Sequence, residues 1–254
     1  MDRNFIATFR TLTEGVAGAL VRTVGGVPVA ATMLPLAFFN ATFVTERVPG
    51  GATDPEAAVT LLRELGVPFT VHLRNDLDPA TRSSVDGLGL AWTGTLPGMA
   101  MPPRAAPALP ATLSVRRATD EARLADHRAV AAAAFGMQPD LIERLMPTAL
   151  LANPDVRVYV GTEDGIPVAS SLAIRTDEIL GIYNVATIEA ARGRGFGTAM
   201  TWMAIADAAP GVEVAILQAS ALGRPVYEQM GFRTVVEYEE LEGSIAEPRR
   251  APTS

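Results

Sequence analysis

A short run of glycines and arginines, Arg192-Gly193-Arg194-Gly195-Phe196-Gly197-Thr198, lies between a strand-like apolar run and an alanine-rich, helix-like run. Glycine lets the backbone come close to a ligand. A loop that opens into a helix presents unpaired N–H groups at the positive end of the helix dipole, and such groups bind anions. The two arginines add donors that suit phosphate. We therefore expect an anion site here, with a plain strand-to-helix turn as the alternative.

This loop differs from two common phosphate-binding motifs. The dinucleotide fingerprint needs a third glycine where Thr198 stands, and a P-loop needs a lysine after its last glycine. The chain contains no lysine, so Schiff-base chemistry on lysine is excluded as well.

The composition excludes several other kinds of site. Without cysteine there are no disulfides, thiolate zinc sites or cysteine nucleophiles. His72 and His127 are the only histidines and lie far apart in the sequence, so we expect no metal. A net charge of −7 argues against nucleic acid as a partner. We find no signal peptide and no run of apolar residues long enough to span a membrane, so we expect a cytoplasmic protein.

One proline-rich run divides the chain. Four prolines within residues 102–110 can continue neither a helix nor a central strand. We therefore predict four segments: an N-terminal domain (1–101), a linker (102–112), a C-terminal domain (113–242) and a disordered tail (243–254).

The C-terminal half alternates between helical and strand-like patterns, which predicts an α/β (α+β) domain with a mixed sheet. The expected order is α-α-β-β-β-α-β-α-β: helices 119–135 and 139–151, strands 156–160, 167–175 and 179–187, helix 197–209, strand 212–219, helix 224–230 and strand 232–241.

The N-terminal half has a similar outline, and its β-α-β-α-β order suggests an internal structural repeat. The expected elements are a helix over 2–21, strand 38–45, helix 55–65, strand 67–73, helix 79–85 and a hairpin or two short strands within 87–101.

Two motifs in the C-terminal half resemble those of the GCN5-related N-acetyltransferase (GNAT) family. The family's loop has Arg or Gln, two residues, Gly, one residue, then Gly or Ala, as in Arg192, Gly195 and Gly197. Its closing Tyr, three residues, Gly-Phe element is matched by Tyr227, Gly231 and Phe232. The resemblance covers about residues 113–241. It implies a GNAT acyl-CoA N-acyltransferase fold for this half, with a degenerate GNAT-like N-terminal domain in tandem.

The resemblance also implies acetyl transfer from acetyl-CoA, as acyl donor, to an amine. The backbone from Gly193 to Thr198, including Arg194 and Phe196, would hold the CoA pyrophosphate together with Arg192. The strand end Val185-Ala186-Thr187 would pair with the pantetheine arm where it separates from the strand over 212–219. A backbone N–H near Thr187 or Ile188 would polarise the acetyl carbonyl.

Two side chains are candidate catalytic residues. Tyr227 would protonate the departing CoA thiolate, because a phenol carries its proton at pH 7; packing against the sheet is its alternative role. Ser220 would bond the CoA arm or a water, or else cap the end of a strand. Some family members carry a glutamate as general base midway along the strand before the loop, but that position falls near Gly181 here. We therefore expect deprotonation through water, a neutral amine, or a side-chain base not identified.

The N-terminal half lacks the signature, because the segment 46–51 does not match the loop pattern and Pro49 removes an N–H. Without cofactor binding, this half would wall off the acceptor pocket or form the surface of a homodimer. Two other functions stay open: transfer from a longer acyl-CoA, and a non-catalytic CoA-binding sensor or scaffold.

Overall fold

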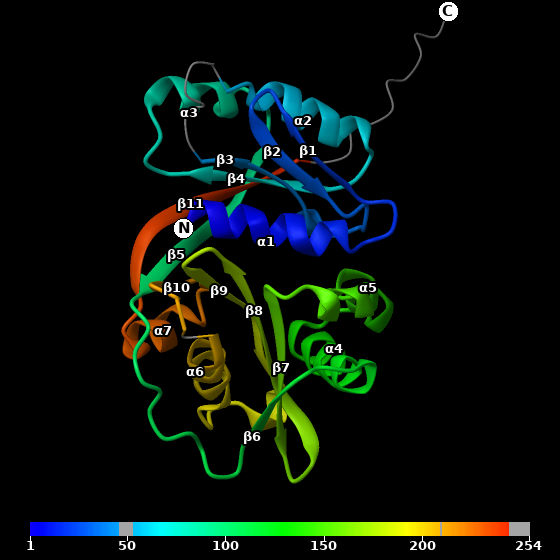
Figure 1. Ribbon diagram of the computed structural model, residues 1–254. Coiled ribbons are helices and arrows are strands. Elements are labelled where there is room, and N and C mark those ends of the chain that lie inside the picture. The colour runs from blue at the N-terminus through cyan, green and yellow to red at the C-terminus, as the bar shows by residue number, and fades with distance from the viewer. Residues whose placement is uncertain (46–52, 209, 244–254) are drawn as a thin grey trace, which may run out of the picture. The chain divides into compact units, whose positions relative to one another are not determined.

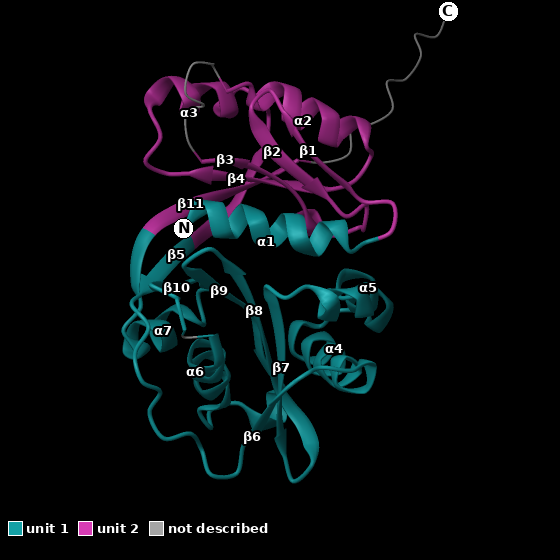
Figure 2. Ribbon diagram, viewed as in Figure 1, with its two compact units in different colours: residues 1–16, 97–235 teal, residues 17–96, 236–254 magenta. Residues whose placement is uncertain are grey.

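The computed structural model describes residues 1–45, 53–208 and 210–243 (Figure 1). Two compact units make up the chain (Figure 2): unit 1 comprises residues 1–16 and 97–235, and unit 2 comprises residues 17–96 and 236–254. The expected loop at 46–51 and the tail after Gly243 lie outside the described residues.

Unit 1 holds a mixed sheet with the strand order β5-β10-β9-β8-β7-β6. Strands β9 and β10 run parallel, whereas the neighbouring pairs are antiparallel. Its elements are α1 (Asp2–Glu14), the end of β5 (Ala91–Met101), β6 (Ser114–Arg117), α4 (Glu121–Phe135), α5 (Pro139–Leu145), η2 (Thr148–Ala152), β7 (Val156–Glu163), β8 (Ile166–Thr176), β9 (Ile179–Thr187), η3 (Glu189–Ala191), α6 (Phe196–Ala208), β10 (Val214–Gln218), α7 (Arg224–Met230) and the start of β11 (Arg233–Gly243).

Helices α4 and α6 cover opposite sides of the central strands of unit 1 (Figure 1). Helix α6 is apolar nearly all round, and eight of its 13 residues are buried, seven of them in the main hydrophobic core. A helix of this kind is stable only when it is enclosed by other elements. The Asp120 carboxylate accepts from the N–H of Arg123 to begin α4, and Gly136 ends that helix in the left-handed region at φ +65°.

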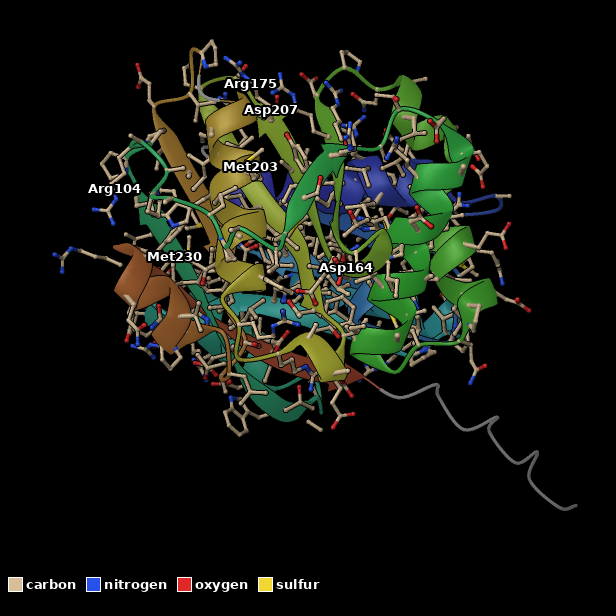
Figure 3. The ribbon with its side chains drawn as sticks, turned by 90° about the horizontal axis from the view of Figure 1, so that it is seen from below. Arg104, Asp164, Arg175, Met203, Asp207 and Met230 are labelled. Carbon is tan, nitrogen blue, oxygen red and sulfur yellow. The ribbon has the colours of Figure 1, made fainter. Side chains whose placement is uncertain are left out.

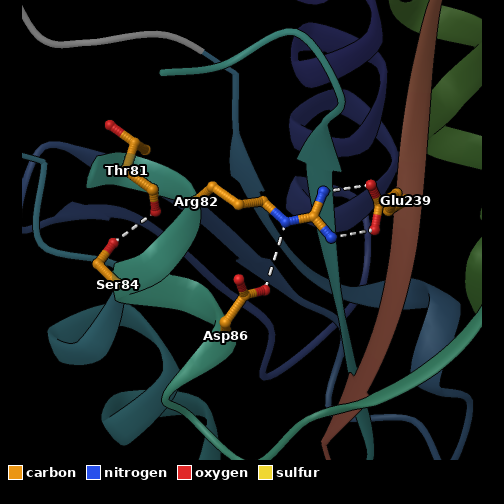
Figure 4. Close-up of polar contacts among 5 residues, drawn as sticks. All are labelled: Thr81, Arg82, Ser84, Asp86 and Glu239. Carbon is orange, nitrogen blue, oxygen red and sulfur yellow. Dashed lines mark hydrogen bonds and ion pairs between the residues drawn. The ribbon is translucent and has the colours of Figure 1, made fainter. Parts of the chain in front are cut away.

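In unit 2 the strands follow the order β1-β2-β3-β4-β11, with β3 and β4 parallel. Aspartate side chains cap both of its α-helices. Figure 4 shows Arg82 of α3 paired with Glu239 of β11, while its Nε lies 3.3 Å from Asp86. The elements of unit 2 are β1 (Leu20–Val24), β2 (Val27–Ala31), η1 (Ala37–Phe39), β3 (Asn40–Val44), α2 (Pro55–Glu64), β4 (Phe69–Arg74), α3 (Pro79–Asp86) and parts of β5 and β11.

The mixed α/β fold and the element order predicted for the C-terminal half are confirmed, with β6 as an additional strand. The predictions for the N-terminal half were less accurate. The helix expected over 2–21 ends at Glu14, and the hairpin β1–β2 follows, because Gly25 and Gly26 adopt positive φ values that suit a tight turn. The segment 87–101 contains one strand, β5, instead of a hairpin.

The division into units does not follow the proline-rich linker. Helix α1 belongs to unit 1, although it lies in the segment predicted as the N-terminal domain, and the end of β11 belongs to unit 2. Both β5 and β11 pass from one unit into the other.

Candidate functional site

The predicted anion loop runs from η3 into the first turn of α6. Gly193 and Gly195 have φ values of +76° and +79°, in the left-handed region that glycine tolerates best. A Cβ on Gly193 would meet no atom within 4 Å, and one on Gly195 would meet only Pro110 Cγ at 3.9 Å. The loop is therefore open to a ligand, and the first N–H groups of α6 lie directly behind it.

Phe196 and Gly197, at the start of α6, pack this helix against the sheet. Phe196 is buried in the main core. A Cβ on Gly197 would lie 3.6 Å from Thr187 Oγ1 and 3.8 Å from Val185 Cγ1, which are ordinary packing distances. Phe196 and Gly197 thus bring the start of α6 close to the end of β9, and Thr198 follows, half-buried, in the same turn.

The two loop arginines have different partners. Arg192 donates from Nε to the Thr187 carbonyl (3.2 Å) and from Nη2 to the Ala134 carbonyl (3.3 Å), so it ties the loop to β9 and to the end of α4. Arg194 forms an ion pair with Glu163 of β7, with Nη1 and Oε2 2.6 Å apart. This hydrogen bond lowers the pKa of Glu163. Arg194 therefore carries a counter-ion already, which the sequence analysis did not identify.

Strands β9 and β10 separate beside this loop. Their parallel pairing covers only three residue pairs, from Ile179–Val214 to Gly181–Ile216. Beyond them β10 continues to pair with β5, and β9 continues to pair with β8 as far as Thr187. Beyond the last pair, the backbone edges of the two strands face each other, and a ligand with amide groups can bridge them.

Val185, Ala186 and Thr187 lie on the β9 side of this separation. A bulge precedes them, where Asn184 has φ +49°. Ile188 donates its N–H to the Val168 carbonyl at 3.0 Å. Because that donor is already used, Ile188 is a poor candidate for polarising a carbonyl, and Thr187 is the better of the two.

Tyr227 lies on α7 and is partly buried. Its ring packs edge-on against Phe232 with 5.8 Å between the centroids. Burial raises the pKa of Tyr227 to about 12, although a hydrogen bond with the Thr201 hydroxyl acts in the opposite direction. The phenol is therefore protonated at pH 7, as a general acid must be.

The Tyr-x-x-x-Gly-Phe motif also has a structural role. Gly231 ends α7 at φ +99°, and the N–H of Phe232 donates to the Tyr227 carbonyl at 3.0 Å. This pattern is a glycine helix cap with its hydrophobic contact.

Ser220 caps α7. Its Oγ accepts from the N–H of Gly223 at 3.1 Å, and its carbonyl accepts from the N–H of Arg224 at 2.9 Å. The side chain is exposed. These bonds give Ser220 a structural role in the turn before α7.

The Gly181 position is closed by a side chain from α1. A Cβ on Gly181 would lie 2.0 Å from Asn4 Oδ1 and 2.4 Å from the Tyr183 ring, so a larger residue would not fit. Asn4 is fully buried; its Nδ2 donates to the Ile174 carbonyl (3.0 Å), and its Oδ1 accepts from the Tyr183 hydroxyl (2.7 Å). The neutral side chains of Asn4 and Tyr183 thus occupy the place where some members of the family carry a glutamate. Asn4 was missed, although a polar residue on the buried side of an amphipathic helix is a usable signal.

Gln218, at the end of β10, was also missed as a site residue. Ala215 and Leu217 point into the main core, so Ile216 and Gln218 face the other side of the sheet, where Gly181 lies opposite Ile216. The Gln218 amide nitrogen lies 3.4 Å from Met1 Sδ of α1, and its Oε1 is buried without a hydrogen-bond partner. This oxygen is a vacant acceptor two residues beyond the last β9–β10 pair.

Among residues 1–45, 53–208 and 210–243, no group of three or more His, Asp or Glu side chains is placed to hold a metal ion. No helix in the same ranges is long and apolar enough to cross a bilayer.

Residues 104–214 match the family model of the acetyltransferase (GNAT) domain. No curated protein matches the chain. Among solved structures, a GCN5-related N-acetyltransferase from Kribbella flavida is similar in fold, with a TM-score of 0.68 and 17% identity over 93% of this chain and 94% of that one. A tandem GNAT protein from the clavulanic acid biosynthesis pathway has a TM-score of 0.64 and 13% identity over 94% and 88%. A GCN5-related N-acetyltransferase from Sphaerobacter thermophilus has a TM-score of 0.61 and 19% identity, over 84% of this chain and 75% of that one.

Proposed function

Because residues 104–214 are a GNAT acetyltransferase domain, and the protein is thereby an acyltransferase, we propose that it transfers the acetyl group of acetyl-CoA to an amine by direct attack in a ternary complex. The observation that carries this proposal is the separation of β9 from β10 beside an open glycine loop. The strand edges suit the amides of a pantetheine arm, and the loop suits its pyrophosphate.

Each part of the site has one task in binding the donor. The N–H groups from Gly193 to Thr198 hold the pyrophosphate, while Arg192 fixes the loop to β9. Val185 and Ala186 offer backbone groups to the pantetheine amides. The N–H of Thr187 donates to the carbonyl oxygen as negative charge develops there.

The chemistry requires one bond to form and one to break. The bound donor supplies a thioester whose carbonyl carbon is the electrophile. The amine nitrogen bonds to that carbon, the C–S bond breaks, and Tyr227 gives its phenolic proton to the leaving sulfur. The proton lost by the amine passes to water, and the Tyr227 phenolate recovers a proton from solvent.

The acceptor side of the separation is neutral and polar. Gln218 Oε1 can accept a hydrogen bond from an attacking N–H, whereas Asn4 and Tyr183 close the place where a glutamate base would stand. Without a carboxylate at that position, an amine that arrives neutral is the acceptor that these groups favour.

The first 101 residues, up to the linker 102–112, form in this proposal a degenerate GNAT-like domain without a donor site. The similarity in fold to a tandem GNAT protein over 94% of the chain supports it. The catalytic domain would then be 113–242, completed by α1.

Thermal unfolding with and without acetyl-CoA tests the proposed function. A ligand that binds only the folded protein adds about 2.7 kcal/mol at 100 times its dissociation constant. We expect acetyl-CoA and CoA to raise the melting temperature, and NAD, which also carries a pyrophosphate, to leave it unchanged.

Release of free thiol from acetyl-CoA in the presence of a panel of primary amines then reports turnover. No shift with any CoA species would contradict donor binding. A shift without thiol release from acetyl-CoA or from longer acyl-CoA donors would favour a non-catalytic CoA-binding protein.

A further inference from the structure

Glu163 is the last residue of β7, directly before the turn into β8. Because side chains alternate along a strand, Glu163 lies on the same face of β7 as Gly161. That face meets α6, since a Cβ on Gly161 would lie 2.9 Å from Met200 Sδ. The strand therefore directs the Glu163 carboxylate toward the loop that precedes α6, where it meets Arg194.

The carboxylate of Glu163 holds Arg194 at two points. Nη1 of Arg194 donates to Oε2 at 2.6 Å, and Nη2 donates to Oε1. The guanidinium carbon also lies 4.8 Å from the centroid of the Phe196 ring, so the side chain is held on a second side. Nε takes no part in the pair with Glu163, and an arginine has five N–H groups in all. Arg194 can therefore bind an anion while it keeps its contact with Glu163.

Glu163 also contacts the end of the linker. The hydrogen bonds from Arg194 lower the pKa of Glu163, and a further hydrogen bond with the Thr112 side chain acts in the same direction. The linker reaches the loop as well, because Pro110 Cγ would lie 3.9 Å from a Cβ on Gly195. The Glu163 side chain is only 17% exposed. One largely enclosed carboxylate thus joins β7, the linker and the glycine loop.

These contacts restrict a loop that would otherwise be flexible. Gly193 and Gly195 lie within it, and glycine loses more conformational freedom than any other residue when its backbone is fixed. Arg192 anchors one end of the loop to β9 and α4. The pair with Glu163 anchors the middle of the loop to β7. A loop that is fixed in advance binds its ligand more tightly, because less freedom is lost on binding.

We propose that Glu163 is a positioning residue for the acyl donor: it holds Arg194 and thereby keeps the N–H groups of residues 193–198 in the arrangement that binds the donor's pyrophosphate. This inference rests on the proposed function, because it concerns the site of the same donor. Charge alone predicts the opposite dependence, since a carboxylate repels an anionic ligand. Removing the charge of Glu163 therefore separates the two effects by the sign of the change in affinity.

Calorimetric titration of the full chain with CoA measures that sign. Glu163→Gln keeps the shape of the side chain and removes the ion pair with Arg194. We expect this variant to bind CoA about three- to tenfold more weakly than the wild type. If Glu163 acted only through its charge, the same variant would bind CoA more tightly.

Asp164→Asn is the matched control, because it removes the same charge one residue away. Asp164, labelled in Figure 3, is exposed and adopts φ +50° in the turn, a conformation that asparagine also tolerates. Glu163 raises the pKa of Arg194 through its hydrogen bonds, and Asp164 does so through its charge. Since Asp164→Asn keeps the pair of Glu163 with Arg194, it should bind CoA like the wild type or up to about twofold more tightly.

Two further measurements show whether Glu163 acts through Arg194 and on donor binding alone. In an Arg194→Gln background, Glu163→Gln should cause no additional loss of CoA affinity, because its partner is already absent. In steady-state kinetics of thiol release, Glu163→Gln should raise the KM for acetyl-CoA and leave kcat unchanged, since the pyrophosphate takes no part in the reaction.

Four results would overturn the assignment: unchanged or tighter binding of CoA by Glu163→Gln, an equal loss in Asp164→Asn, a further loss in the Arg194→Gln background, or a lower kcat in Glu163→Gln. Failure of the wild-type protein to bind CoA, or to release thiol from acetyl-CoA with any amine, would instead contradict the proposed function.

Discussion

At the scale of single residues, Arg192 and Arg194 have the same chemistry and flank the same glycine, yet they have different partners. Arg192 donates to backbone carbonyls at the ends of β9 and α4, whereas Arg194 faces Glu163. The motif predicted the loop and its glycines, because those depend on neighbours in sequence. It could not predict Glu163, which is 31 residues away and reaches the loop only through the fold.

Tyr227 is the residue on which the proposed chemistry depends most. Replacing Tyr227 by Phe keeps the ring against Phe232 and removes only the hydroxyl. We expect thiol release from acetyl-CoA to fall by about 10²- to 10⁴-fold, the usual contribution of a positioned general acid, with donor affinity unchanged. Single-turnover kinetics and calorimetry separate these two quantities.

Thr201→Val is the matched control, because it removes the hydroxyl that hydrogen-bonds Tyr227 and leaves the phenol in place. Burial keeps the Tyr227 phenol protonated at pH 7 without that hydrogen bond, so the variant should retain turnover. Full activity in Tyr227→Phe would remove Tyr227 from the mechanism.

At the scale of elements, the strands and helices of the C-terminal half follow from local patterns, but the packing of α1 does not. Gly181 was correctly placed on a strand, and the sequence offered no carboxylate there. What fills the position is Asn4, about 175 residues earlier in the chain. Periodicity predicts that a helix begins near Asp2; it does not predict which strand the helix covers.

The Asn4 contacts make α1 part of unit 1 and should be measurable in its stability. Asn4→Ala removes the partner of the Tyr183 hydroxyl and a donor to the Ile174 carbonyl, both of which stay buried. Each buried polar group left without a partner costs about 1–3 kcal/mol, so we expect a loss of about 2–4 kcal/mol in the free energy of unfolding. Urea denaturation followed by the fluorescence of the buried Trp202 measures this loss.

Arg10→Ala is the control on the same helix, because Arg10 is exposed and pairs with Glu14 across one turn. It should change stability by less than about 0.5 kcal/mol. If Asn4→Ala costs no more than Arg10→Ala, the Asn4 contacts do not hold α1 against the sheet.

At the scale of the whole molecule, each unit encloses one of the two histidines. His127 in unit 1 and His72 in unit 2 are fully buried, and burial lowers their pKa values to about 4 and about 3. Their separation in the sequence argued against a shared metal site. Their burial gives them another property, because each folded unit holds its imidazole neutral at a pH where the unfolded chain protonates it.

The free energy of unfolding should therefore fall with acid in the range set by these shifts. Because the folded pKa of His127 lies below the unfolded value of 6.5, its contribution to stability is complete above pH 6.5 and is lost progressively as the pH falls toward about 4. For His127 alone the loss reaches about 2 kcal/mol by pH 5.

The two tryptophans allow unit 1 to be observed separately, since Trp202 belongs to unit 1 and Trp92 to unit 2. In a Trp92→Phe background, urea denaturation followed by Trp202 fluorescence should show this loss between pH 7.5 and pH 5. With His127→Gln added, the change over the same interval should shrink by about 2 kcal/mol, whatever the stability of that variant at pH 7.5. An undiminished loss would mean that other groups, such as the carboxylates, make unit 1 sensitive to acid.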